Sequence, residues 1–174
     1  MNKINLQLFA EAVQGKKIIY LFRVLSKTAT NAAAAMAFVT ENERTKSKDA
    51  DTTATKDGAI RTPGQTETEI SATAILAVGD TLADELEAAM DNDELIEVWE
   101  VNLAEKGATD DKYKGTYYQG YLTEFSLTSS AEEHAEYSTT FGINGKGAKG
   151  EVTVTAEQQE IAQYVFKDTE ATGA

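Results

Sequence analysis

The stretch ERTKSKDADTTATKDG, residues 43–58, contains no large apolar side chain. It lies between AAAAMAFVT, residues 32–40, and ETEISATAIL, residues 67–76, and both flanking segments have the composition of β-strands. A compact domain seldom has so long a polar connection unless that connection has a function. We therefore predict a long, charged, threonine-rich hairpin that takes part in what the protein does.

Alternating apolar and polar residues predict that most of the chain is β-structure. In residues 67–76 the apolar side chains fall on one face and the polar ones on the other, which is typical of a half-solvated strand. Residues 34–40 suit a strand or, because they are rich in alanine, a helix. The predicted strands are residues 16–25, 34–40, 67–76, 95–103, 116–127, 137–143 and 151–155.

One helix is predicted over residues 80–91. Thr81 can cap its first turn, with Asp84 three residues further on, and acidic residues suit the positive end of the helix dipole. Its apolar stripe consists of Leu82, Leu86, Ala89 and Met90. Residues 155–166 suit a second, short helix, and Asn144 followed by Gly145 predicts a hairpin turn.

These elements predict a mainly β fold, an antiparallel β-sandwich or partial barrel of about seven strands flanked by one α-helix. The chain of 174 residues suits one domain with extensions. We expect an N-terminal arm at 1–15, the β-domain at 16–155 and a C-terminal segment at 156–174, a possible short helix followed by a flexible tail.

Composition excludes several classes of function. The formal net charge of −13, from 29 acidic and 16 basic residues, disfavours tight binding of nucleic acid or of an anionic membrane. The absence of cysteine removes disulfides and thiolate chemistry. The N-terminal apolar patch is too short for a signal peptide, and the longest apolar run is too short for a membrane span, so we expect a soluble protein made in the cytoplasm.

Four patterns that suggest ligands have simpler explanations. The glycines of NGKGAKG, residues 144–150, precede a strand and not a helix, so they favour a flexible turn over a dinucleotide site. The acids near Asp51 and near Asp91 lack the EF-hand spacing. His134 has Ser129, Ser130 and Glu133 near it in sequence, but nothing suggests a nucleophile elbow or an oxyanion hole, so an exposed turn histidine is favoured. Trp99 with the nearby tyrosines favours cross-strand packing over a sugar platform. We expect no catalytic residue, cofactor, metal or small-molecule ligand.

The ordered set of segments nevertheless resembles a known family. TKDGAIRTPG, ETEISATAIL, GDTLADELEAAM and IEVWEVNL are followed by KYKGTYYQGYLTEF and STTFGINGKGAKGEVTVT. This order is similar to that of the major tail proteins, or tail-tube proteins, of long-tailed, non-contractile bacteriophages. The resemblance covers about residues 13–166, and TKDG and YYQGYLTEF are its most specific parts.

The resemblance implies a structural virion protein that forms hexameric rings, and these rings stack into a tube through which the genome leaves. Sheets of neighbouring subunits would join edge to edge around the lumen, in a fold related to the tube protein of type VI secretion systems. DNA would pass without specific binding. The implied partners are other copies, a tail-tip or baseplate initiator, a tape-measure protein and a tail terminator, with assembly in the host cytoplasm and no membrane.

Three groups of residues are candidates for assembly. The family's corresponding hairpin reaches the adjacent ring, and we assign this role to residues 46–64, where the charged side chains are Lys46, Lys48, Asp49, Asp51, Lys56, Asp57 and Arg61. Leu6, Leu8 and Phe9 suit an N-terminal contact with a neighbour. Glu67 and Glu69 suit the wall of a wet lumen, because an acidic wall repels DNA.

Two other classes of function remain open. A β-sandwich binding module of an adhesin shares the threonine-rich strands and the lack of cysteine. Such a module stays monomeric, whereas a tube protein forms rings, so self-association distinguishes the two. An enzyme is the third possibility, although no constellation of residues supports it.

Overall fold

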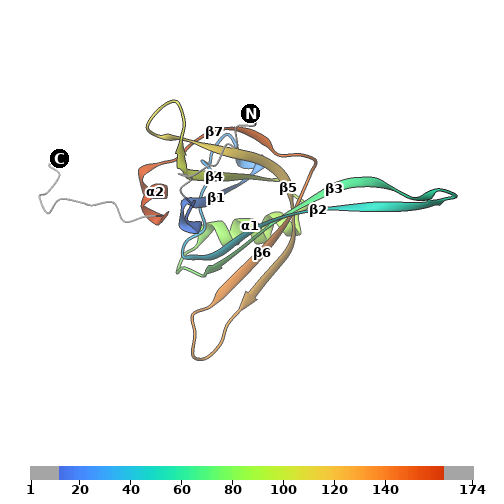
Figure 1. Cartoon of the computed structure of the whole chain (residues 1–174). Helices are drawn as coiled ribbons and strands as arrows, with labels where there is room; N and C mark the ends of the chain where they lie inside the picture. The colour runs from blue at the N-terminus through green and yellow to red at the C-terminus, as the bar shows by residue number, and fades with distance from the viewer. Residues whose placement is uncertain (1–11, 163–174) are drawn as a thin grey trace, which may run out of the picture.

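The computed structural model describes residues 12–162 and the side chains up to residue 159. The predicted N-terminal contact residues Leu6, Leu8 and Phe9 lie outside this range. Short 3-10 turns lie at Gly15–Lys17 and Leu25–Lys27. The other elements are β1 Ile18–Val24, β2 Val39–Thr55, β3 Gly58–Ile75, α1 Thr81–Asp91, β4 Ile96–Lys106, β5 Lys112–Thr128, β6 Glu136–Ile143, β7 Ala148–Thr153 and α2 Ala156–Ala162 (Figure 1).

The seven strands form one antiparallel sheet in the order β1-β4-β5-β6-β3-β2, and β7 pairs with β5. β5 is the central strand. Its first half pairs with β4 on one edge and β7 on the other, and its second half pairs with β6. The prediction of a mainly β, antiparallel fold of about seven strands with one flanking helix is confirmed.

The sheet curves until its two halves face each other across the core. Phe22 on β1 stacks on Phe141 on β6, with ring centroids 5.0 Å apart, although β4 and β5 separate these strands in the sheet. α1 lies beside this stack and buries Leu82, Leu86 and Ala89 in the same cluster. Because a single flat sheet could not bring these rings together, the fold is a partial barrel around one main core.

A smaller apolar cluster covers the opposite face of β1 and β4. Its buried members are Leu21, Val101, Leu103, Tyr113 and Val154. Gln158 of α2 fixes this layer, because its side-chain amide donates to the carbonyl oxygen of Ala33 at 2.8 Å. Gln158 also forms a reciprocal cap with Thr155, so the predicted second helix begins at a real capping box.

The N-cap of α1 lies one residue earlier than predicted. The side chain of Asp80 accepts hydrogen bonds from the backbone N–H groups of Leu82 and Ala83, both at 3.1 Å, so Asp80 and not Thr81 is the N-cap. The same carboxylate accepts from the buried Tyr137 hydroxyl at 3.3 Å. At 11 residues α1 is short, and the described residues include no helix long and apolar enough to span a membrane.

The predicted strand at residues 34–40 is wrong. Ala34 forms only an isolated bridge with Phe22, and Met36 is fully buried in the main core. Phe38 then adopts a left-handed backbone with φ of 48°, which turns the chain into β2 at Val39. The apolar composition of this segment therefore reflects core packing of a connection and not a strand.

The predicted hairpin turn at Asn144 and Gly145 is also wrong. β6 and β7 do not pair with each other, since both lie along the same edge of β5, one after the other. Gly145 adopts φ of 67°, as the turn motif requires. The short connection, however, joins two strands that follow one another along the same edge of β5. A turn signal fixes the local backbone and leaves the pairing of the flanking strands open.

Candidate assembly surface

The most prominent feature is the outer part of the β2–β3 hairpin. β6 pairs with β3 only from Glu69 onward. Residues 46–68 therefore pair only with each other, and no further strand of the described chain lies beside them. They project from the body as a two-stranded ribbon, hereafter the ribbon (Figure 1). An isolated two-stranded hairpin is at best marginally stable in water. The ribbon therefore gains little stability from the rest of the described chain.

Local sequence explains the shape of the ribbon. Thr55 pairs with Gly58, which leaves a two-residue turn at its tip, and Gly58 supplies φ of 134°. Further in, a bulge places Asp49 opposite Gly64 and the following residue. A Cβ on Gly64 would lie 3.2 Å from the carbonyl oxygen of Asp49, so the bulge is tight. β2 and β3 thus extend through the stretch that sequence alone marks as a polar connection.

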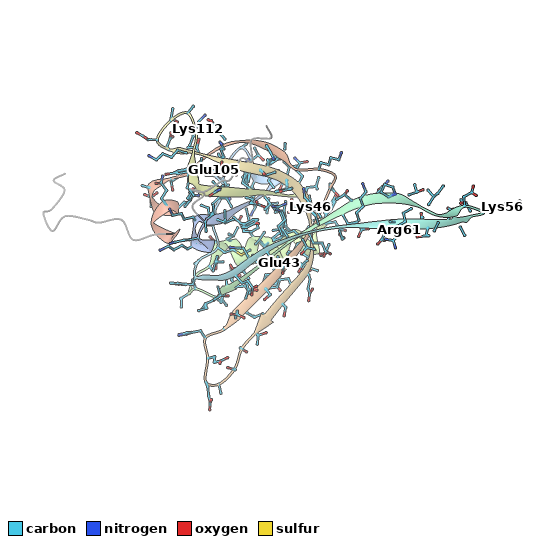
Figure 2. All side chains as sticks on the ribbon, viewed as in Figure 1. Glu43, Lys46, Lys56, Arg61, Glu105 and Lys112 are labelled. Atoms are coloured by element: carbon cyan, nitrogen blue, oxygen red, sulfur yellow. The ribbon has the colours of Figure 1, made fainter. Side chains whose placement is uncertain are left out.

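One face of the ribbon is basic. Side chains of directly paired residues share a face, and successive residues alternate between faces. Arg44 pairs with Ile70, whose side chain is fully buried in the core, and Lys46 and Lys48 follow on the same face. Beyond the bulge the register places Arg61 on it too. Figure 2 labels Lys46 near the base of the ribbon and Arg61 further out. These four cations and the small or apolar residues between them, with no acid, form the basic face.

The opposite face is acidic. It continues over the outward side of β6 and the second half of β5, where hydroxyl side chains such as Ser138 and Thr140 separate the acids. This acidic face carries Glu41, Glu43, Asp49, Asp51, Glu67, Glu69, Glu124 and Glu136. Within these four strands of the described chain, it carries no lysine or arginine. The predicted lumen residues Glu67 and Glu69 both lie on it.

Several charged side chains of the body form ion pairs, whereas the predicted assembly residues of the ribbon do not. On the body, Arg23 pairs with Glu97 at 2.7 Å, and four other lysines or arginines each contact an acid. On the ribbon, the seven predicted assembly residues have no ion-pair partner among the residues that the structure describes. The structure groups Lys46, Lys48 and Arg61 on one face, separates them from Asp49 and Asp51, and places Lys56 and Asp57 in the turn at the tip.

A partly buried ion pair that the sequence analysis missed holds the base of the ribbon. Nε of Arg44 lies 2.5 Å from Oε2 of Glu100 on β4, and the Tyr20 hydroxyl donates to the same carboxylate at 3.0 Å. Burial and the Glu100 charge both raise the pKa of Tyr20, so its hydroxyl remains a donor. The contact joins strands that are far apart in the sheet order and so fixes the direction of the ribbon. The only sign of this role in the sequence is the alternation that places Arg44 on the core-facing side of the strand.

Two strand edges remain free on the same four-stranded part of the sheet. Among the described residues, no strand lies beyond β2. On β5, the edge opposite β6 is covered by β4 only up to Gly120, so residues 121–128 have an open edge there. Open edges of this length normally promote aggregation unless another chain pairs with them. Both edges border the acidic face.

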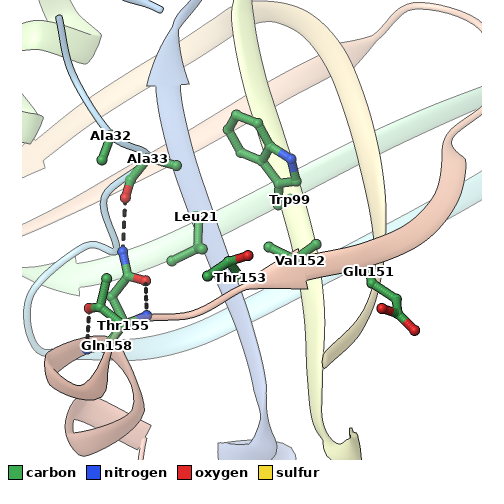
Figure 3. A pocket seen from close by; sticks show the side chains of 9 residues that line it. All are labelled: Leu21, Ala32, Ala33, Trp99, Glu151, Val152, Thr153, Thr155 and Gln158. Atoms are coloured by element: carbon green, nitrogen blue, oxygen red, sulfur yellow. Dashed lines mark hydrogen bonds between the residues drawn. The ribbon is translucent and has the colours of Figure 1, made fainter. Parts of the chain in front are cut away.

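An open cleft of about 380 Å³ lies beside α2, with Leu21, Trp99 and Val152 in its lining (Figure 3). Trp99 pairs directly with Tyr117 across strands, with ring centroids 5.3 Å apart, so the predicted packing role is confirmed. Arg23 covers the indole at 5.1 Å. The described residues contain no cluster of three potential metal ligands, and His134 lies exposed in the β5–β6 connection.

Solved structures share this fold. The SPP1 tail tube, determined by solid-state NMR and cryo-EM, superposes with a TM-score of 0.71 at 21% identity, covering 94% of this chain and 95% of that one. The tail of an empty gene transfer agent particle, refined with C6 symmetry, gives 0.58 at 14% identity over 79% and 98%. The sheath–tube complex of an extracellular contractile injection system gives 0.53 at 13% identity over 83% and 95%. The fold is that of tail tubes.

Sequence comparison goes further. A curated protein of Staphylococcus phage phiMR25, described as a candidate tail protein, is 35% identical over 142 residues, which are 79% of this chain and 74% of that protein. The family model of phage tail tube proteins matches residues 12–149. The chain belongs to the phage tail tube protein family. It is a structural component of a virion tail and not an enzyme.

Proposed function

We propose that copies of this chain join edge to edge into rings of six and that these rings stack into the tail tube. The observation that carries the proposal is the pair of free edges, on β2 and on residues 121–128 of β5, that border the same four strands. Pairing one edge with the other in the next copy is a heterologous contact, which closes a ring when the rotation fits. The C6 symmetry of the gene transfer agent tail, whose fold is similar, supports six subunits.

In such a ring the acidic face lines the lumen. Glu67 and Glu69 then point toward the passing genome, as does Glu124 on the neighbouring strand pair. Duplex DNA carries about one negative charge per 1.7 Å, and a wall without cations offers no group that releases its counterions. DNA therefore slides through without adsorbing, and the net charge of −13 contributes to this behaviour.

The ribbon extends from one ring to the next. Its charged side chains have no ion-pair partners within the described chain, and its two strands lack a neighbour that would stabilise them. Contact with an adjacent ring supplies both, because Lys46, Lys48 and Arg61 then meet acids of another copy. In this arrangement the tube grows in one direction from an initiator at the tail tip or baseplate.

The other partners follow from the place of such a protein in a tail. A tape-measure protein would occupy the lumen during assembly, and a terminator would close the last ring. Assembly would take place in the host cytoplasm before the tail joins the virion. Solved caps and baseplates of the anti-feeding prophage contain chains with the same fold, which is consistent with tube proteins meeting both kinds of partner.

Negative-stain electron microscopy of the purified chain, from dilute to concentrated, tests the proposal. We expect hollow rings whose end-on class averages have sixfold symmetry, and tubes at higher concentration. A different ring number would contradict the hexamer. Monomers at every concentration, confirmed by sedimentation velocity, would contradict self-assembly and favour the adhesin-like binding module.

A further inference from the structure

The end of the sheet opposite the tip of the ribbon carries an exposed apolar surface. The far-end patch consists of Phe38, Val39, Leu76, Val78 and Leu127. The described residues expose nine large apolar side chains, and five of them lie in this patch, so the clustering is not random scatter. Val78 is fully exposed and Phe38 is 67% exposed.

Strand register brings the patch together. Val39, Ala74, Tyr137 and Leu127 lie opposite one another on four adjacent strands, which places Val39 and Leu127 about 14 Å apart at the usual strand spacing. The N–H group of Ile75 donates to the carbonyl oxygen of Phe38 at 3.1 Å, so the residues that follow β3 lie beside those that precede β2. The patch residues therefore lie around one end of the sheet, where Ala74 and Tyr137, between Val39 and Leu127, are themselves buried.

Phe38 shows that this surface is costly in an isolated molecule. Its φ of 48° lies in the left-handed region, which disfavours a bulky side chain. The same backbone places most of its ring in water. A residue that is both strained and exposed is explained when a partner covers the ring, because burial then offsets the strain.

Charge around the patch matches the ribbon. Ile75 pairs with Glu136, and Glu136 pairs with Thr128, so the β5–β6 connection at residues 129–135 lies at the same end of the sheet. That connection carries Glu132 and Glu133 and no lysine or arginine. The basic face of the ribbon is complementary, since its cations share that face with small or apolar residues, Ala50, Ala54, Ala59 and Pro63.

We propose that the far-end patch is the surface on which the ribbon of a second copy docks. The ribbon and the patch lie at opposite ends of one sheet, so the contact is head to tail and repeats without closing, as growth along a filament requires. Apolar residues of the patch cover the small residues of the ribbon, and Glu132 and Glu133 meet its lysines and arginine. This inference rests on the proposed function, because it identifies the acceptor of the inter-ring contact.

Cysteine cross-linking tests the docking directly, because the chain has no cysteine of its own. Ala59→Cys in the ribbon is mixed with Val78→Cys in the patch, or with Met90→Cys on α1 as the control, under mild oxidation. We expect a covalent heterodimer of roughly twice 18.8 kDa with Val78→Cys, at several times the yield of the control. Equal yields from the two mixtures would overturn the proposal, whether or not the wild-type chain forms tubes.

A second pair of variants separates docking from folding. Leu76→Glu and Met90→Glu change side chains that are 37% and 36% exposed, so their costs to the isolated fold are matched. We expect Leu76→Glu to raise the concentration threshold for tubes about tenfold or more, while Met90→Glu leaves it nearly unchanged. If the wild type forms tubes and the two variants have equal concentration thresholds, the docking of the ribbon on the patch is refuted and the proposed function stands. If the wild type forms no rings, the proposed function is refuted.

Discussion

At the scale of single residues, Glu97 gives the clearest effect on stability. Burial would raise the pKa of this carboxyl, but hydrogen bonds from Arg23 and Tyr117 at 2.7 and 2.8 Å, with the Arg23 charge, lower it below its ordinary value. A lowered folded-state pKa adds stability above the unfolded value of about 4.3, and this stability is lost as pH falls through the folded pKa. We expect Glu97→Gln to cost about 2 kcal/mol at pH 7 and less at pH 3, measured by urea unfolding of the monomer.

The half-buried Glu94→Gln is a suitable control, since the hydrogen bond that its carboxylate accepts from Ser26 is exposed. A cost for Glu97→Gln that did not shrink on acidification would contradict the assigned protonation.

Residues of this kind were the hardest to predict from sequence, because their partners are far away: 74 positions separate Arg23 from Glu97. Asp80 was missed as the cap for a different reason, since Thr81 beside it is an equally good capping residue by composition.

At the scale of elements, the ribbon should be separable from the body. Residues 52–61 can be replaced by Asn-Gly, which closes a two-residue turn between the paired Asp51 and Thr62. The shortened chain should keep its thermal unfolding midpoint within a few degrees, because none of the deleted residues is buried. We expect it to form no tubes under the electron microscope. The control replaces only Lys56 and Asp57 with Asn-Gly, and tubes of normal length from the shortened chain would remove the ribbon from assembly.

Strand alternation predicted the elements whose faces differ in polarity. Residues 67–76 were predicted correctly because Ile70, Ala72 and Ala74 face the core while the acids between them face outward. The hairpin of the ribbon was predicted from its length and polarity, but the bounds of its strands were not, since no apolar face exists there to produce a period of two. The segment 34–40 was misassigned because a buried connection has the same apolar composition as a strand.

At the scale of the whole molecule, the charge pattern and not the net charge should determine how the tube treats DNA. Glu67, Glu69 and Glu124 lie exposed on the acidic face, whereas Asp84, Glu87 and Asp91 lie exposed on α1. Replacing either set with lysine changes the net charge by the same amount. With the acidic face toward the lumen, only the first set places cations within the screening length of about 8 Å from a passing duplex.

We therefore expect tubes of the first triple variant to retain a labelled short DNA duplex at low salt and to release it as salt rises, with a slope set by the phosphates neutralised. Tubes of the α1 variant should retain about as little as wild type in the same filter assay. Stronger retention by the α1 variant would place the helix, and not the acidic face, on the inside of the tube. The assay thus reads the orientation of every subunit from one bulk measurement, because the two sets lie on different faces of the same fold.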